Sequence, residues 1–356
     1  MPSTAVTAVT AAPAGAEPAA SAGLAEYELS GAETDELRGL AKALADAPYD
    51  PVDAGFYDRC WPAAAQLPRG LREFLEGFRR AEGAAGCLVR GFPVDDQAIG
   101  PTPAHWDAAE PGRHTLESEL YLALCGLVLG EPFAWASLQA GRVVQNILPI
   151  AGDEKRQSGY GSKALLEFHT EDGFHPLRCD YLLLLGLRNH DDVPTMLSSV
   201  RDIALSDADR RLLSEERYYI LPDDEHVRQL QTRDPGNPAL DRMLRMRDDP
   251  QPMAVLFGDP HDPYLRIDRP FMRAVGRDAA AEAALDRLMA ELERVQQEIV
   301  VGPGTLLVVD NYLAVHGRRA FDVRYDGTDR WLKKLTVSRN LRRGLTFGAG
   351  HPRIVH

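Results

Sequence analysis

Apolar side chains recur at helical spacing in part of the chain, and this pattern predicts amphipathic helices. We expect these helices at residues 30–44, 67–78, 115–129 and 279–300. The first opens with Ser30 three residues before Glu33, which is the pattern of a capping box. The last helix is the clearest of them, and its core-facing stripe consists of Leu285, Leu288, Met289, Leu292 and Val295.

Elsewhere the apolar residues form short runs bounded by glycine and proline, which is typical of β-strands. Such runs lie at residues 85–94, 142–149, 180–187, 194–200, 253–258, 264–268, 301–311 and 331–337. The pattern predicts a mixed α/β protein with an all-β core, a barrel of antiparallel strands flanked by helices.

The first 22 residues differ from the rest, because they are rich in Ala, Pro, Thr, Ser and Gly and contain few large apolar side chains. They predict a disordered N-terminal tail rather than a secretory signal. Residues 23–356 are expected to form a single domain. No apolar run approaches the roughly 20 residues that span a bilayer, so no membrane segment is expected.

The amino-acid composition limits the classes of partner that this domain is expected to bind. The 356 residues carry a formal net charge of −13, which argues against a nucleic-acid partner because phosphate binding depends on clustered Lys and Arg. Cys60, Cys87, Cys125 and Cys179 are widely spaced and predict reduced, buried thiols in a cytoplasmic protein. No feature of the sequence indicates an oligomeric state.

The chain is organised around His169 and Glu171. If one strand carries both, its two-residue period points the imidazole and the carboxylate to the same face. His316, returning from far down the chain, would complete a set of two histidines and one carboxylate. That set suits non-haem Fe(II), because it leaves open positions for an oxidant and a co-substrate.

The same His-x-acid pattern also occurs at His105 and His190, so the pattern alone is weak. His105 lies in a Pro-rich connection and His190 in a polar turn, and both are interpreted as solvated loop residues. From the pattern alone, His169 and Glu171 are either metal ligands or a structural histidine with an acidic neighbour.

Two polar segments have two interpretations each. The glycine-bearing run 152–162 precedes His169 and is either a substrate lid or a flexible connection. The acidic cluster 223–225 is either a solvated loop, which its pattern favours, or a lid that approaches a cationic substrate.

Three segments resemble a known family. They are His-Thr-Glu-Asp at 169–172, Val-Asp-Asn at 309–311 followed by His-Gly-Arg at 316–318, and Tyr-Asp-Gly-Thr-Asp-Arg-Trp-Leu-Lys at 325–333. The chain resembles the clavaminate-synthase-like Fe(II)/2-oxoglutarate oxygenases over roughly residues 27–342. Within that group it is most similar to the L-arginine β-hydroxylases of viomycin and streptothricin biosynthesis.

The resemblance implies a double-stranded β-helix (jelly-roll, cupin-like) core. It implies that His169, Glu171 and His316 bind Fe(II), and that Arg330 and Thr195 bind the distal carboxylate of 2-oxoglutarate, with O2 as the oxidant. A guanidinium suits this task because it can grip a carboxylate bidentately. The presence of Glu171 argues against a halogenase, because those relatives have a small residue at this position.

The resemblance further implies a free L-amino acid as substrate, hydroxylated at its β-carbon in antibiotic biosynthesis. Arginine or an arginine-derived amino acid with a cyclised guanidino group is the first choice, and lysine, citrulline and asparagine come next. The implied substrate contacts are Gln139, Ser158, Glu171, Asp268 and Lys334.

The match to the arginine hydroxylases is incomplete. Arg269 and Pro270 follow Asp268, where those enzymes have a second aspartate two places on, and Lys334 replaces an arginine. Asp223, Asp224 or Glu225 is expected to supply the second acid. A cupin-like metalloenzyme that does not use 2-oxoglutarate and a non-catalytic binding protein are the alternatives from other classes.

Overall fold

The computed structural model describes residues 24–46, 48–108, 113–344 and 351–356. Its helices are α1 (Gly31–Ala45), α2 (Ala54–Cys60), α3 (Arg69–Ala81), α4 (Leu116–Leu129), α5 (Asp207–Leu213), α6 (Asp224–Arg233), α7 (Pro238–Asp248) and α8 (Ala279–Arg294). No helix in these ranges is long and apolar enough to cross a membrane. The expected tail, residues 1–22, lies outside the described residues.

The strands build two larger sheets. The first has the order β1 (Ala25–Glu28), β2 (Gly86–Arg90), β13 (Leu306–Asp310), β6 (Tyr181–Arg188), β15 (Trp331–Ser338), β3 (Glu131–Trp135) and β16 (Ile354–Val355), with β4 (Gln145–Ile147) paired to β15. The second has the order β12 (Gln297–Val300), β7 (Pro194–Ser199), β14 (Ala314–Arg318) and β5 (Leu166–His169).

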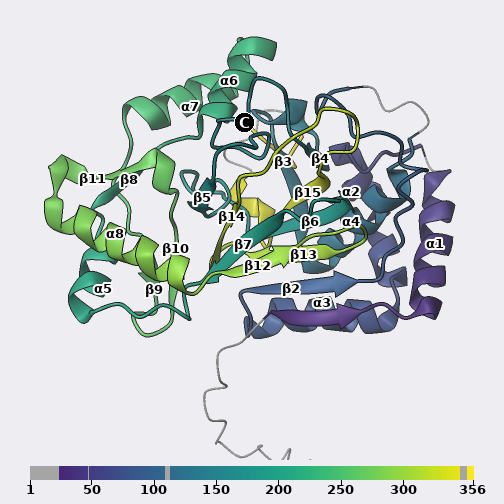
Figure 1. Cartoon of the computed structure of the whole chain (residues 1–356), viewed down its shortest axis with the longest axis horizontal. Helices are drawn as coiled ribbons and strands as arrows, with labels where there is room; N and C mark the ends of the chain where they lie inside the picture. The colour runs from purple at the N-terminus through teal and green to yellow at the C-terminus, as the bar shows by residue number, and fades with distance from the viewer. Residues whose placement is uncertain (1–23, 47, 109–112, 345–350) are drawn as a thin grey trace, which may run out of the picture.

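Two two-stranded antiparallel sheets complete the strands, β9 (Leu256–Gly258) with β10 (Pro263–Leu265) and β8 (Tyr218–Ile220) with β11 (Met272–Ala274). In Figure 1 the helices of the N-terminal part lie on one side of the strands, and α5 to α8 lie on the opposite side. The prediction of a mixed α/β protein with strands flanked by helices is confirmed.

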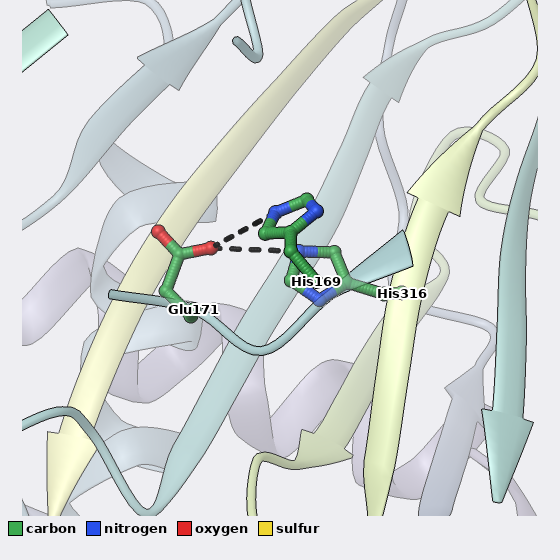
Figure 2. Close-up of side chains that lie close together, drawn as sticks. All are labelled: His169, Glu171 and His316. Carbon is green, nitrogen blue, oxygen red and sulfur yellow. Dashed lines mark ion pairs between the residues drawn. The ribbon is translucent and has the colours of Figure 1, made fainter. Parts of the chain in front are cut away.

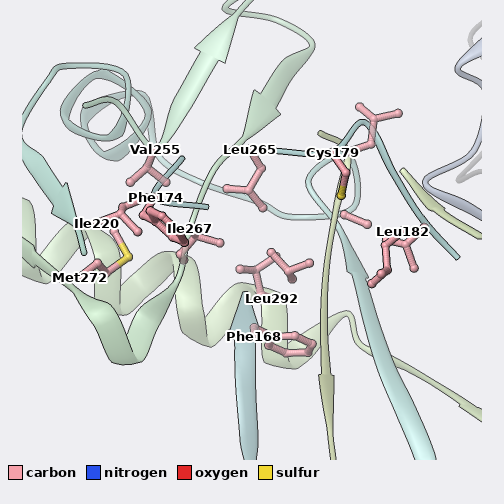
Figure 3. Close-up of a cluster of buried hydrophobic side chains, with 14 of the residues drawn as sticks. Phe168, Phe174, Cys179, Leu182, Ile220, Val255, Leu265, Ile267, Met272 and Leu292 are labelled. Atoms are coloured by element: carbon pink, nitrogen blue, oxygen red, sulfur yellow. The ribbon is translucent and has the colours of Figure 1, made fainter. Parts of the chain in front are cut away.

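Side-chain alternation in the larger sheet produces two cores. Along β6, Leu182 and Leu184 join the core shared with the four-stranded sheet and α8, part of which is shown in Figure 3. Leu183 and Leu185 point the other way, into the core shared with α1, α3 and α4. Because successive side chains in a strand point to opposite faces, a sheet covered on both faces needs the continuous apolar run that this strand has.

Most predicted elements are confirmed, although several strands are shorter than predicted. Ser30 forms a capping box with Glu33 at the start of α1, as its spacing predicts. All four cysteines are free and buried. His190 is exposed and lies in a loop, as predicted.

The predicted extent of the last helix is wrong. Helix α8 ends at Arg294, and Gln297–Val300 forms strand β12, which pairs antiparallel with β7. The segment Gln-Glu-Ile-Val gains backbone hydrogen bonds from β7 that a continued helix would not provide, so a tertiary contact overrides the local pattern.

Lys333 on β15 is fully buried, and its Nζ lies 2.7 Å from Oε1 of Glu119 on α4. We expect Lys333→Met to lower the free energy of unfolding by about 3–5 kcal/mol, because it leaves the Glu119 carboxylate buried without its ammonium. Urea denaturation measures this change. Lys42→Met, at an exposed position of α1, is the control and should change stability by less than about 0.5 kcal/mol. Equal stability of the two variants would contradict the prediction.

Candidate active site

Two histidines meet across neighbouring strands. His316 on β14 lies directly opposite His169 on β5 in the antiparallel register, and their ring centroids are 4.2 Å apart. Oε2 of Glu171 lies 3.4 Å from Nε2 of His316 and 4.0 Å from Nε2 of His169, as the dashed lines in Figure 2 show. One ligand atom from each residue lies within 4.8 Å of the others. The three side chains therefore face one point.

Glu171 reaches this point by a route that differs from the prediction. Strand β5 ends at His169, so Glu171 lies in the following turn and not on the same strand. Its backbone N–H donates to Oδ1 of Asn311 at 2.7 Å, and Nδ2 of Asn311 donates to the Glu171 carbonyl at 3.0 Å. A fully buried amide from 140 positions down the chain fixes the turn. The two-residue period of a strand therefore does not determine the position of Glu171.

The surroundings prepare His169 and Glu171 to bind a cation. Nδ1 of His169 lies 2.9 Å from the carbonyl of Glu167, and a proton on that nitrogen leaves the Nε2 lone pair facing the centre. Burial, together with the nearby His316, lowers the pKa of His169 to about 4. Burial raises the pKa of Glu171, but the Lys334 ammonium and both imidazoles outweigh it and hold the pKa well below its usual range. Neutral imidazoles and an ionised carboxylate are the forms that bind metals.

The chemistry of this donor set fits an iron ion. Two imidazoles and one carboxylate on one side of a metal make the facial triad of non-haem Fe(II) oxygenases. Lys334 donates to Oε1 of Glu171 at 2.6 Å, so Oε2 is the oxygen left for the metal. His169, Glu171 and His316 are the residues that could hold the ion.

Asn311→Ala tests whether the two hydrogen bonds between the Asn311 amide and the Glu171 backbone hold Glu171 in place for metal binding. We expect the affinity for a divalent metal to fall roughly 10- to 100-fold, as for other groups that orient metal ligands. The free energy of unfolding should fall by about 1–3 kcal/mol, because the Glu171 amide loses its buried partner. Titration with Mn(II) and urea denaturation measure the two effects. Asn340→Ala, at an exposed position, is the control, and a metal affinity equal to that of the control would contradict this role.

The three residues line a pocket of about 1020 Å³, counted out to its open mouth. Of the residues singled out in the sequence, the pocket lining also includes Ser158, Thr195, Asp223, Asp268, Arg330 and Lys334.

One part of the pocket is cationic. Arg330 is 7% exposed and immediately precedes β15, and its Nη2 donates to Oγ1 of Thr195 at 3.2 Å. Its Nε is buried and has no hydrogen-bond partner among the described residues. Burial, with a smaller contribution from Arg318, lowers the pKa of Arg330 to about 9, so the guanidinium keeps its charge at neutral pH. A buried, charged and partly unsatisfied guanidinium fits a carboxylate ligand.

Another part of the pocket is acidic. Asp268 is 7% exposed and pairs through its backbone with His169, and burial followed by the nearby charge of Asp223 raises its pKa well above the usual range. Burial also raises the pKa of Asp223 to about 6. A buried and a half-buried carboxyl group close to each other favour a cationic ligand, because a positive charge between them would let both ionise.

The acidic cluster is not the solvated loop that its pattern favours. Asp223 caps α6, and its side chain accepts a hydrogen bond from the Glu225 N–H. Glu225 is buried and lines the pocket, whereas Asp224 is exposed and is not among the lining residues. Of the three acids, Asp223 best fits the expected second acid, because its charge acts on Asp268 and raises the pKa of that carboxyl group.

Gln139 lies behind the pocket wall. Its Nε2 donates to the Asn146 carbonyl at 2.7 Å and to the Tyr160 hydroxyl at 2.8 Å, and its Oε1 accepts from the Asn146 N–H at 3.0 Å. It is fully buried and is not among the lining residues. Its contact with a substrate amino group stays a prediction.

The three side chains that converge are called the metal trio and are His169, Glu171 and His316. Two residues close to it have no role assigned from the sequence. Arg318 lines the pocket two positions after His316, so the two-residue period of a strand would have indicated it. Asp172 accepts from Nε1 of Trp135 at 2.5 Å and lies 3.0 Å from Nε2 of His226 on α6. This link between the metal trio and α6 joins distant parts of the chain and has no signal in the local sequence.

Comparison with known proteins agrees with this geometry. The family described as "Taurine catabolism dioxygenase TauD, TfdA family" matches residues 66–336. An enduracididine beta-hydroxylase from Streptomyces hygroscopicus is 40% identical over 290 residues, which cover 79% of this chain and 84% of that protein.

Solved structures of the non-heme iron oxygenase OrfP share the fold. The complex with Fe, succinate and (3S)-hydroxy-L-Arg has a TM-score of 0.87 at 38% identity, covering 93% of this chain and 99% of that chain. The complex with Fe and alpha-ketoglutaric acid has a TM-score of 0.82 at 38% identity, covering 93% and 100%. The resemblance found in the sequence is confirmed, and the chain belongs to the TauD/TfdA family of dioxygenases.

Proposed function

We propose that this protein is an Fe(II)/2-oxoglutarate-dependent hydroxylase of a free L-amino acid in antibiotic biosynthesis. Its substrate is arginine or an arginine-derived amino acid with a cyclised guanidino group, hydroxylated at the β-carbon. The observation that carries the proposal is one pocket in which His169, Glu171 and His316 converge and which has both a cationic and an acidic part. The OrfP complexes with iron, alpha-ketoglutaric acid and hydroxyarginine support the same assignment.

In this proposal each part of the pocket has its own task. His169, Glu171 and His316 hold Fe(II), and Arg330 with Thr195 binds the distal carboxylate of 2-oxoglutarate. When bound, the iron, 2-oxoglutarate and O2 supply the oxidation of an unactivated C–H bond, with succinate and CO2 as co-products. The protein orients the substrate β-carbon and keeps water out of the pocket.

The acidic part binds the guanidino group of the substrate. Asp268 supplies one carboxylate, and Asp223, which caps α6, supplies the second in place of the aspartate that Pro270 displaces. Lys334, Ser158 and Glu171 line the same pocket and hold the α-carboxylate and α-amino groups. Pro270 and Phe271 also line the pocket and add apolar surface, which suits a ring better than a flexible chain.

The proposal includes the architecture. Two mainly antiparallel sheets that share one hydrophobic core support a double-stranded β-helix, and we assign residues 23–356 to one oxygenase domain.

The experiment is an assay of purified protein with Fe(II), O2 and 2-oxoglutarate against free L-amino acids. The panel contains arginine, enduracididine, lysine, citrulline and asparagine, and both succinate and product mass are measured. We expect succinate in step with a gain of one oxygen on a guanidino amino acid. Citrulline, a neutral analogue of arginine, should react far more slowly because it offers no charge to Asp268 and Asp223. Absence of succinate from iron-loaded protein would contradict the proposal and favour a metalloenzyme that does not use 2-oxoglutarate.

Asp268→Asn tests the acidic part of the pocket. We expect kcat/KM for the guanidino substrate to fall about 30-fold to a few thousand-fold, because one partner of a buried charge pair is lost. The matched control is Asp224→Asn, since Asp224 follows Asp223 at the start of α6 but is exposed. A loss of activity in Asp224→Asn as large as that in Asp268→Asn would contradict this assignment.

A further inference from the structure

Arg318 lies in the pocket but has no role in the function proposed so far. It is two residues after His316 on β14, and alternate side chains of a strand share a face, so both point toward the pocket. In the register of β14 with β7, Arg318 is directly opposite Thr195. Arg330 donates to the hydroxyl of that same threonine. Thr195 is therefore the cross-strand neighbour of Arg318 and the hydrogen-bond partner of Arg330.

The side chain of Arg318 is buried with most of its hydrogen-bonding capacity unused. It is 3% exposed, its Nη2 makes one long hydrogen bond of 3.4 Å to the Ala164 carbonyl, and its Cζ lies 4.8 Å from the centre of the Phe321 ring. Its Nε and Nη1 are buried and have no hydrogen-bond partner among the described residues. Nε of Arg330 is in the same state.

Burying a charged group is unfavourable unless the group is paired and hydrogen-bonded. The two guanidinium groups are close enough for the positive charge of Arg318 to disfavour that of Arg330. An arginine side chain nevertheless keeps its charge at any working pH. No ion pair forms between either guanidinium and a carboxylate within the described ranges. An anionic group in the adjoining pocket, which both arginines line, would satisfy these donors.

We propose that Arg318 and Arg330 together bind the distal carboxylate of 2-oxoglutarate, with the Thr195 hydroxyl between them. This inference rests on the proposed function, because it takes 2-oxoglutarate as the co-substrate. A carboxylate has two oxygens that accept several hydrogen bonds, so it can satisfy donors from both guanidinium groups. The two arginines then make the site selective for 2-oxo acids with a second carboxylate over those with an uncharged end.

The test compares two 2-oxo acids of the same carbon chain length. Binding of 2-oxoglutarate and of 2-oxopentanoate, which lacks the distal carboxylate, is measured by calorimetry on protein loaded with Mn(II) in place of Fe(II). We expect Arg318→Gln to weaken binding of 2-oxoglutarate roughly 10- to 100-fold, because hydrogen bonds to a charged group are lost. Binding of 2-oxopentanoate should change by less than about twofold.

Two further variants make the result specific. Arg319→Gln is the matched control, because Arg319 is the next residue, is exposed and pairs with Glu298 on the surface. Arg318→Lys keeps the charge and should retain an intermediate preference for 2-oxoglutarate. It also provides a measurement if Arg318→Gln does not fold.

The outcomes separate this inference from the function on which it rests. If Arg318→Gln weakens binding of both 2-oxo acids equally, the role of Arg318 is structural and the inference is wrong. An unchanged preference in the Arg318 variants, with the preference lost in Arg330→Gln, would also overturn it while the proposed function stands. A wild-type protein that does not prefer 2-oxoglutarate would contradict the proposed function, and this inference with it.

Discussion

His316→Ala is expected to abolish hydroxylation and to weaken divalent-metal binding by more than about 100-fold. Residues that only orient a metal ligand already contribute 10- to 100-fold to affinity, and this change removes a ligand itself. The remaining donors, His169 and Glu171, leave the ion with one imidazole and one carboxylate. Titration of the protein with Mn(II), followed by calorimetry, measures the affinity directly.

Thermal unfolding gives a second readout of the same variant. A ligand that binds only the folded state stabilises it by about 2.7 kcal/mol at a hundredfold excess over its dissociation constant. Added metal should therefore raise the Tm of the wild type and leave that of His316→Ala unchanged. His190→Ala is the control, because His190 lies in an exposed His-x-acid sequence away from the pocket. Metal binding by His316→Ala at wild-type affinity would contradict the assignment of the metal trio.

Arg330→Met is expected to raise KM for 2-oxoglutarate by about 30-fold to a few thousand-fold. A buried charged group that loses its partner costs about 2–5 kcal/mol, and each 1.4 kcal/mol is a factor of ten. Methionine fills most of the volume of the arginine side chain while removing the charge and the donors. The initial rate of succinate formation at varied 2-oxoglutarate concentration measures the effect.

The same variant separates two classes of enzyme. A metalloenzyme that does not use 2-oxoglutarate would lose little activity with Arg330→Met, whereas the proposed hydroxylase would lose nearly all of it at low 2-oxoglutarate concentration. Metal affinity should stay close to that of the wild type, because the hydrogen bond of Arg330 goes to Thr195 and not to one of the three metal-binding side chains. Arg324→Met is the control, since Arg324 is exposed and pairs with Asp191 on the surface. An unchanged KM in Arg330→Met would rule out its role in binding the co-substrate.

Much of the fold follows from local pattern. The continuous apolar run of β6 predicts a strand covered on both faces, and the two cores on either side of it confirm this. The capping box at Ser30 and the stripe on α3 predict their helices for the same reason. These patterns are readable because they depend on the backbone geometry of near neighbours in the chain.

The geometry of the metal trio could be predicted only in part from local sequence pattern. The motif segments singled out His169, Glu171 and His316, and the three side chains do converge. The expected reason for the position of Glu171 was wrong, because the strand stops at His169 and the buried amide of Asn311 holds the next turn. A hydrogen bond across 140 positions leaves no periodic signal.

The sequence by itself determined the α/β composition, the buried strand at 180–187, the family and the residues able to bind a metal. Only the tertiary structure decided that Gln297–Val300 is a strand, that Asp223 rather than Asp224 lines the pocket, and that Arg318 lies opposite the threonine that Arg330 contacts. The physical reason is the range of the interactions. Helix and strand periodicity arises between near neighbours, whereas strand pairing, burial of charge and the shape of a pocket depend on residues that only folding brings together.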